Sequence, residues 1–229
     1  MQLIILEGLI GAGKTTFAEK LSKLIDAKLY YEPVKDNPYL EDYYKNPKRY
    51  ALEMQFWLMS IRFQLHQDAI KYIWDSGKSA IIDRSIYGDW IFAKQNWLDG
   101  NIDDRGYESY IKHRDVMFRY LMIPHITLFL NADPSVCLER IHMRGRDCEK
   151  AIPQKYLEGL YFLHRELMIE LRQRGSHVVN IDWNEFRDLE STIAKYDVPL
   201  NRTNPLHFQQ AATAQTIQAL TKENSSSLQ

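Results

Sequence analysis

The chain has 229 residues, 45% of them hydrophobic, which is enough to bury the core of one α/β domain. Lys and Arg number 29 against 30 Asp and Glu, and this balance excludes the basic excess of proteins that hold nucleic acid polymers or anionic membranes. A small-molecule ligand is therefore expected.

Alternating apolar and amphipathic stretches predict strands and helices in turn along the chain. Five short apolar runs are predicted to be buried strands, the second weaker than the others: 3–6, 28–31, 79–82, 126–130 and 177–181. Apolar residues at helical spacing between them predict helices near 17–25 and 54–65. Strands that alternate with helices imply a five-stranded parallel sheet with helices on both faces.

The later part of the chain contains one clear helix start and one change of composition. Asp133 before Pro134 predicts an N-cap and the first turn of a helix that runs to about Arg144. From about residue 201 the chain turns polar and Ser-rich. We therefore expect one domain over residues 1–200 and a polar tail over 201–229 that is partly mobile.

The cysteines and the first residues bear on the cellular compartment. Cys137 and Cys148 form neither a CxxC pair nor a disulfide framework, so both are expected to be reduced thiols. Met1 and Gln2 precede the first strand without a charged leader or a long apolar segment. These features predict a cytoplasmic protein with no membrane partner.

The segment GLIGAGKT at 8–15 fits the phosphate-binding pattern GxxxxGK[ST] and stands between the first predicted strand and the first helix. Its glycines let backbone N–H groups point inward at an anion, and the helix adds its positive N-terminal end. Lys14 is expected to reach the β and γ phosphates, and the Thr15 hydroxyl to bind Mg²⁺. A plain glycine-rich turn is the alternative, but all the required residues coincide in register. The predicted nucleotide-binding residues here are Gly8, Ile10, Gly11, Ala12, Gly13, Lys14, Thr15 and Thr16.

Charged side chains follow the second and third predicted strands. Glu32 comes after the second strand, and Asp83 and Arg84 come at the end of the third. Ligands bind at the carboxyl ends of strands in an open parallel sheet, so all three are expected to face the phosphate site. There Glu32 can accept a proton, Asp83 can hold Mg²⁺ and Arg84 can balance developing charge. From position alone, a solvated Glu32 and a surface salt bridge of the other two stay open as alternatives.

Four motifs in this order resemble those of the deoxynucleoside kinases: GLIGAGKT at 8–15, EPV at 32–34, DRS at 83–85 and RGRDCE at 144–149. The resemblance covers most of the chain, from about Gln2 to about Ile181. It implies a three-layer α/β P-loop kinase fold with an Arg-rich lid, and ATP and Mg²⁺ as cofactors.

The same resemblance assigns catalytic roles. It makes Glu32 the general base and Arg84 its partner at the 5′-hydroxyl of a deoxynucleoside, with Lys14 at the phosphates. Thr15 and Asp83 take the positions that bind the metal.

The resemblance also supplies a substrate pocket. Gln55 matches a glutamine that hydrogen-bonds the base, and Arg62 with Asp89 matches an arginine–acid pair of purine- and deoxycytidine-accepting members. Tyr44 and Glu149 match the pair that binds the sugar 3′-hydroxyl. Without the resemblance, ordinary polar residues beside an apolar stripe are the simpler interpretation.

Three arginines near the end of the 134–144 helix form the predicted lid. Arg140 and Arg144 are one helical turn apart, and Arg146 follows across Gly145, so the three can close over the phosphates. Taken alone, an Arg-rich helix end is more often a feature that complements the helix dipole. The position after the fourth strand favours the lid.

Substrate and assembly follow from the resemblance as well. The segment 36–39, DNPY, resembles the bacterial deoxyadenosine and deoxyguanosine kinases, so a purine is favoured, deoxyadenosine first. Ala93 stands where many animal enzymes place a stacking aromatic ring, with Phe92 beside it. Family members are commonly homodimers packed through their long helices, which implies the same here.

Three other interpretations compete with this one. Thymidylate kinases share the P-loop and an Asp-Arg motif, but Tyr31 and Val34 differ from their acid-proline motif. A non-catalytic subunit of the same fold is a second alternative. Loss of a catalytic residue would favour it, but all four are present: Lys14, Thr15, Glu32 and Arg84. A P-loop ATPase or GTPase switch has no use for a sugar-specific pocket.

Overall fold

The computed structural model describes residues 1–32, 37–146, 149 and 152–200, and five parallel strands form its single sheet. The strands are β1 (Leu3–Glu7), β2 (Lys28–Tyr30), β3 (Ala80–Asp83), β4 (Ile126–Asn131) and β5 (His177–Asp182). Their order across the sheet is β2-β3-β1-β4-β5, and every pairing is parallel. The predicted strands and the parallel sheet are therefore confirmed.

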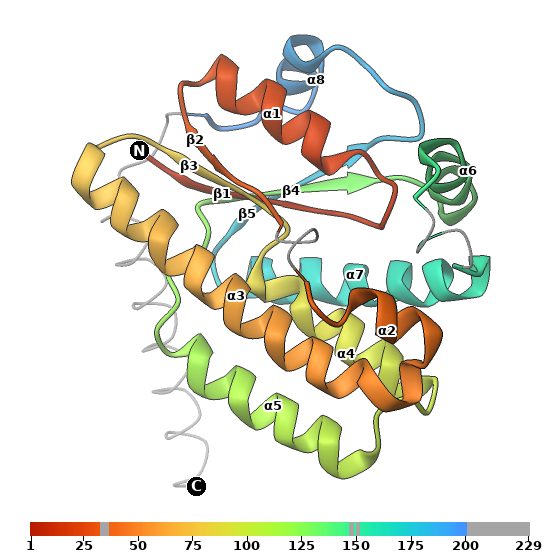
Figure 1. Ribbon diagram of the computed structural model, residues 1–229. Helices are drawn as coiled ribbons and strands as arrows, with labels where there is room; N and C mark the ends of the chain where they lie inside the picture. Colours follow the sequence, from red (N-terminus) through yellow and green to blue (C-terminus); the bar gives the residue numbers. More distant parts are fainter. Residues whose placement is uncertain (33–36, 147–148, 150–151, 201–229) are drawn as a thin grey trace, which may run out of the picture.

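The central strands are buried on both faces because helices cover the two sides (Figure 1). On one face lie α1 and α8, and on the other lie α3, α4 and α7, with α5 packed outside α3 and α4. The helices are α1 (Lys14–Leu24), α2 (Leu40–Lys45), α3 (Pro47–Ser76), α4 (Asp89–Leu98), α5 (Asp104–Phe118), α6 (Pro134–Arg144), α7 (Gln154–Gln173) and α8 (Leu189–Lys195), with a short 3-10 helix η1 (Ile86–Gly88). This is the expected three-layer α/β arrangement.

Local sequence signals define the limits of the longer helices. The Asn46 side chain accepts from the Arg49 N–H at the start of α3, Pro47 occupies its first turn, and Gly77 ends it at φ 68°. The α6 helix starts at Pro134 and ends at Arg144, as predicted. However, the Asp133 side chain does not cap α6, because it accepts from Asn184 Nδ2 instead, at 3.1 Å.

Several predictions concern residues outside those that the structure describes. They include the polar tail at 201–229, the thiol of Cys148, Pro33 and Val34 of the EPV motif, and Asp36. Cys137 is a buried free thiol. Across the described residues, no helix combines the length and the apolar character needed to cross a membrane.

Candidate active site

The glycine-rich loop joins β1 to α1 at the carboxyl edge of the sheet. Gly11 and Gly13 have φ of 83° and 93°, a left-handed conformation that favours glycine. A Cβ on Gly11 would also lie 2.5 Å from the Cys137 carbonyl oxygen, so α6 packs directly against the loop. Gly13 stands at the start of α1 as its N-cap residue, which turns the positive end of this helix toward the loop.

Lys14 is buried at the base of the loop. Its Nζ donates to the carbonyl oxygens of Leu9 at 2.9 Å and Gly8 at 3.2 Å. Burial and the nearby Arg84 lower the pKa of Lys14 to about 8, although neighbouring carboxylates oppose them. A phosphate group here would raise the pKa of Lys14 by favouring the charged form of its side chain.

Thr15 and Asp83, the two predicted metal-binding residues, lie together. The Thr15 hydroxyl donates to Asp83 Oδ2 at 2.5 Å, while the buried Oδ1 of Asp83 has no hydrogen-bond partner in the described part of the chain. Burial raises the pKa of Asp83, so a cation beside it would favour the ionised form. One hydroxyl and one carboxylate suit Mg²⁺, which usually takes its other ligands from phosphates and water. Among the described residues, no group of three or more His, Cys, Asp or Glu side chains could hold a metal.

Glu32 and Arg84 meet beside the glycine-rich loop. Arg84 Nε lies 3.0 Å from Glu32 Oε1, and Arg84 Nη2 donates to the Gly8 carbonyl oxygen at 3.1 Å. Arg62 Nη2 contacts the same Oε1 of Glu32 at 2.6 Å. Burial alone would raise the pKa of Glu32, but Arg84, Arg62 and Lys14 outweigh it and lower the pKa to about 2. Glu32 is therefore an ionised carboxylate at neutral pH.

Arg84 adopts an unusual backbone conformation. It is 2% exposed and has φ of 65°, a left-handed value that costs a residue with a Cβ about 1–2 kcal/mol. Its guanidinium carbon lies 4.8 Å from the centre of the Phe92 ring. Neighbouring contacts hold this strained residue and direct its guanidinium to the junction of Glu32 and the loop.

The predicted base-binding residues form one buried group on α3 and α4. Arg62 makes an ion pair with Asp89 as well as with Glu32, and Asp89 also accepts from the Tyr110 hydroxyl. Gln55 lies two turns before Arg62 on α3 and is 1% exposed, and no residue that the structure describes donates to its Oε1. The structure thus links the predicted base site to the predicted catalytic base through Arg62.

Glu149 joins the predicted sugar site to two of the lid arginines. It is buried, and it makes ion pairs with Arg144 and Arg146, the latter at 3.3 Å. Both arginines are exposed at the end of α6, where Gly145 has φ of 69°. Tyr44 is half-buried on α2 and packs against Tyr43.

Arg140 lies apart from the other two lid arginines. Its guanidinium donates to the carbonyl oxygens of Ala12, Trp183 and Asn184, and lies 4.1 Å from the centre of the Phe186 ring. Arg140 thus connects the glycine-rich loop to the segment after β5. Its predicted contact with phosphates stays a prediction.

Sequence reasoning missed four residues at this site. Glu7 accepts two hydrogen bonds from Ser85, the residue after Arg84. Trp183 and Phe186 follow β5 and lie against Gly13. The second pair could have been found, because these aromatic residues follow the carboxyl end of a predicted parallel strand. Of the first pair, Ser85 is the last residue of the DRS motif and Glu7 directly precedes the glycine-rich loop, but nothing in the sequence indicated that they bind each other.

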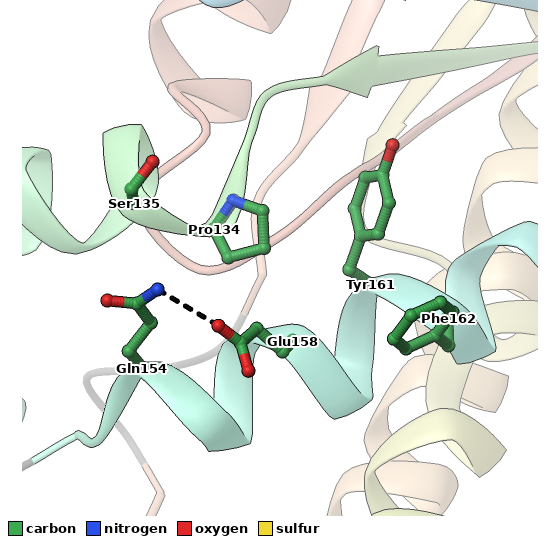
Figure 2. Close-up of a pocket in the computed structure, with 6 residues that line it drawn as sticks. All are labelled: Pro134, Ser135, Gln154, Glu158, Tyr161 and Phe162. Carbon is green, nitrogen blue, oxygen red and sulfur yellow. Dashed lines mark hydrogen bonds between the residues drawn. The ribbon is translucent and has the colours of Figure 1, made fainter.

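A surface hollow of about 340 Å³ lies between α6 and α7, away from these groups. It is lined by Pro134, Ser135, Gln154, Glu158, Tyr161 and Phe162. Figure 2 shows two polar side chains of its lining on α7, where Gln154 Nε2 donates to Glu158 Oε1 at 2.9 Å. None of the predicted site residues lines it.

Comparisons with known proteins point to one family. The sequence profile "Deoxynucleoside kinase" matches residues 4–198. A deoxyguanosine kinase of Dictyostelium discoideum is 43% identical over 188 residues, 82% of this chain and 66% of that protein. A deoxyadenosine kinase of the same organism is 37% identical over 226 residues, 96% of this chain and 90% of that protein.

A solved structure shows the same fold. The structure of deoxyadenosine kinase from M. mycoides with bound dATP superposes on this chain with a TM-score of 0.75 at 27% sequence identity. The superposition covers 88% of this chain and 100% of that chain. The chain belongs to the deoxynucleoside kinase family.

Proposed function

We propose that this kinase transfers the γ-phosphoryl group of ATP to the 5′-hydroxyl of a deoxynucleoside in nucleotide salvage, with a purine favoured and deoxyadenosine first. The observation that carries the proposal is the meeting of Glu32, Arg84 and the glycine-rich loop at one point. An alcohol placed there would face both a carboxylate and the terminal phosphoryl group. The similarity to deoxyguanosine and deoxyadenosine kinases supports the purine.

Glu32 acts first by orienting the acceptor hydroxyl. Both of its ion pairs use Oε1, so Oε2 is the oxygen that accepts from the 5′-hydroxyl. A pKa of about 2 makes Glu32 a weak base. This is compatible with phosphoryl transfer, because its loose transition state needs the hydroxyl proton removed only late.

Arg84 and Lys14 stabilise the charge on the transferring group. Arg84 is already held between Glu32 and the Gly8 carbonyl, so it needs little reorganisation when charge develops. Lys14 and the N–H groups of the loop bind the β and γ phosphates. Thr15 and Asp83 would hold Mg²⁺, which neutralises phosphate charge when it is bound.

Gln55, Arg62 and Asp89 form the proposed base site. Together they offer amide, guanidinium and carboxylate groups, which can pair with the edge of a purine. Tyr44 and Glu149 bind the 3′-hydroxyl in this proposal. Because Glu149 contacts Arg144 and Arg146, occupation of the sugar site would change the contacts of the lid arginines.

Substrate choice is tested by offering labelled ATP with each of four deoxynucleosides and, separately, with dTMP. We expect label in deoxyadenosine monophosphate first and none in dTDP. Lys14→Ala is the control, because activity from contaminating kinases would still be present in a preparation of this variant. Turnover of dTMP alone would instead identify a thymidylate-type kinase, and no transfer to any acceptor would identify a non-catalytic member of the fold.

We further propose a cytoplasmic homodimer. Its interface would lie on α3 and α5, which pack side by side (Figure 1). Trp74 on α3, Val116 on α5 and Tyr120 just after α5 are more than half exposed, at 53%, 56% and 70%. Light scattering should give a molar mass of twice that of one chain, and in Trp74→Glu the measured mass should fall to that of a single chain. A monomeric wild-type protein would refute this assembly.

A further inference from the structure

Glu7 is a buried carboxylate for which the proposed reaction has no use. It is the last residue of β1, directly before the glycine-rich loop, and its side chain is 0% exposed. Its Oε1 accepts two hydrogen bonds from one residue, the Ser85 N–H at 3.0 Å and the Ser85 hydroxyl at 2.6 Å. A fully buried acidic side chain is rare unless it is paired or hydrogen-bonded.

The residue that Glu7 holds stands next to the strained one. Ser85 follows Arg84, whose φ is 65°. The Ser85 hydroxyl in turn accepts from the Tyr87 N–H at 3.1 Å and caps η1. Glu7 therefore fixes the start of η1, and with it the left-handed turn at Arg84.

The space around the carboxylate is fitted to it. A Cβ on Gly88 would lie 2.7 Å from Glu7 Oε2, so the side chain at this position of η1 must be absent. Backbone, hydroxyl and glycine all enclose the same carboxyl group.

Three successive residues of the chain hold Arg84 and its neighbour. The Leu6 carbonyl oxygen accepts from the Arg84 N–H at 3.1 Å, Glu7 binds Ser85, and the Gly8 carbonyl oxygen accepts from Arg84 Nη2 at 3.1 Å. The backbone and the guanidinium of Arg84 are thus fastened to the segment that begins the phosphate loop. Leu6 and Gly8 contribute backbone carbonyl oxygens to these contacts, whereas Glu7 contributes its side chain.

We propose that Glu7 is a positioning residue: by holding Ser85, it keeps Arg84 in the left-handed conformation that directs the guanidinium at Glu32. Its kinetic consequences rest on the proposed function of Arg84. This role requires an acceptor oxygen at the end of a side chain as long as that of Glu, which Gln supplies and Met does not.

The first experiment compares Glu7→Met with Glu7→Gln. Glu7→Met should lower kcat by roughly 100-fold, the usual effect of a misplaced catalytic group, with the KM values for ATP and deoxynucleoside changed less than about threefold. Glu7→Gln should recover most of this loss. Thr127→Val, which removes a buried hydroxyl bonded to Ser176 at 2.7 Å, controls for general loss of stability. A raised KM for ATP as the main effect would overturn the proposal, because Glu7 would then act on the phosphate loop.

The second experiment asks whether Glu7 acts through Arg84. In an Arg84→Lys background, Glu7→Met should lower kcat by no more than about threefold, since residues that act as one unit are not additive. An undiminished 100-fold loss in that background would refute a role through Arg84. If Glu7→Met does not fold, Ser85→Ala removes one of the two donors and should show the same dependence on Arg84.

A third measurement does not depend on activity. In wild-type protein, the Arg84 Nε–H resonance should be slow to exchange with solvent, since this group is buried against Glu32. Glu7→Met should speed its exchange, whereas Glu7→Gln and Thr127→Val should not. Unchanged exchange in Glu7→Met would refute the positioning role even if the proposed reaction is correct. Altered exchange without any effect on turnover would instead refute the catalytic role of Arg84.

Discussion

Replacing Glu32 by Gln tests both the electrostatics and the chemistry of the site. The pKa of Glu32 falls from 4.5 to about 2 because Arg84, Arg62 and Lys14 outweigh burial. At about 1.36 kcal/mol per pKa unit, the folded protein favours the ionised form by about 3 kcal/mol. The isosteric Gln removes the charge but keeps an acceptor for both arginines.

The sign of the pH effect follows from the lowered pKa. A carboxylate with a folded pKa below its unfolded value adds stability above pH 4.5, and this contribution is lost as the pH falls toward 2. Glu32→Gln should therefore cost about 3 kcal/mol of unfolding free energy at pH 7, and roughly half of that at pH 3. Urea unfolding at several pH values measures both.

Turnover of the same variant supplies the second readout. Loss of the proton acceptor should lower kcat by about 100-fold or more while ATP still binds. Glu53→Gln is the matched control, because the Glu53 side chain is 40% exposed and forms a surface ion pair with Arg49, so its cost should stay below about 0.5 kcal/mol. Equal losses at pH 7 and pH 3, or an unchanged kcat, would refute this reasoning.

Three further predictions concern other buried or exposed charged groups. Burial lowers the pKa of His66 to about 4, so between pH 6.5 and 4 the unfolded chain binds a proton that the folded protein does not bind. The free energy of unfolding should therefore fall by roughly 3 kcal/mol over this range. In urea unfolding, His66→Leu should show a weaker dependence on pH. Since the pKa of Lys14 is about 8, ATP affinity by calorimetry should weaken roughly tenfold per pH unit above pH 8, and less in Lys14→Arg. Arg144→Ala or Arg146→Ala should lower kcat more than deoxynucleoside affinity; equal losses in paired titration and rate measurements would leave them binding roles only.

The sheet and the meeting of Glu32 with Arg84 could be predicted because each depends on local patterns. Apolar runs predicted every strand, and parallel strands necessarily bring their carboxyl ends to one edge. Position alone left a solvated Glu32 and a surface salt bridge of Asp83 and Arg84 open, and the resemblance to the deoxynucleoside kinases favoured the site.

The contacts that tune the site depend on packing, so their residues carried no local signal. Arg62 reaches Glu32 from the middle of a 30-residue helix, and only the packing of α3 below the sheet decides that. Arg140 and Arg144 share a helix face by spacing, yet the aromatic segment after β5 holds Arg140 at the loop. Asp133 likewise bonds to that segment instead of capping α6.

The most direct test of the central claim is the position of the phosphate in the product. Phosphorus–proton correlation NMR on wild-type protein with ATP and deoxyadenosine should show the new phosphorus coupled to the two C5′ protons. Its rate of appearance should fall about 100-fold or more in Glu32→Gln. Phosphate on the 3′ oxygen, inorganic phosphate alone, or the wild-type rate in Glu32→Gln would contradict the account.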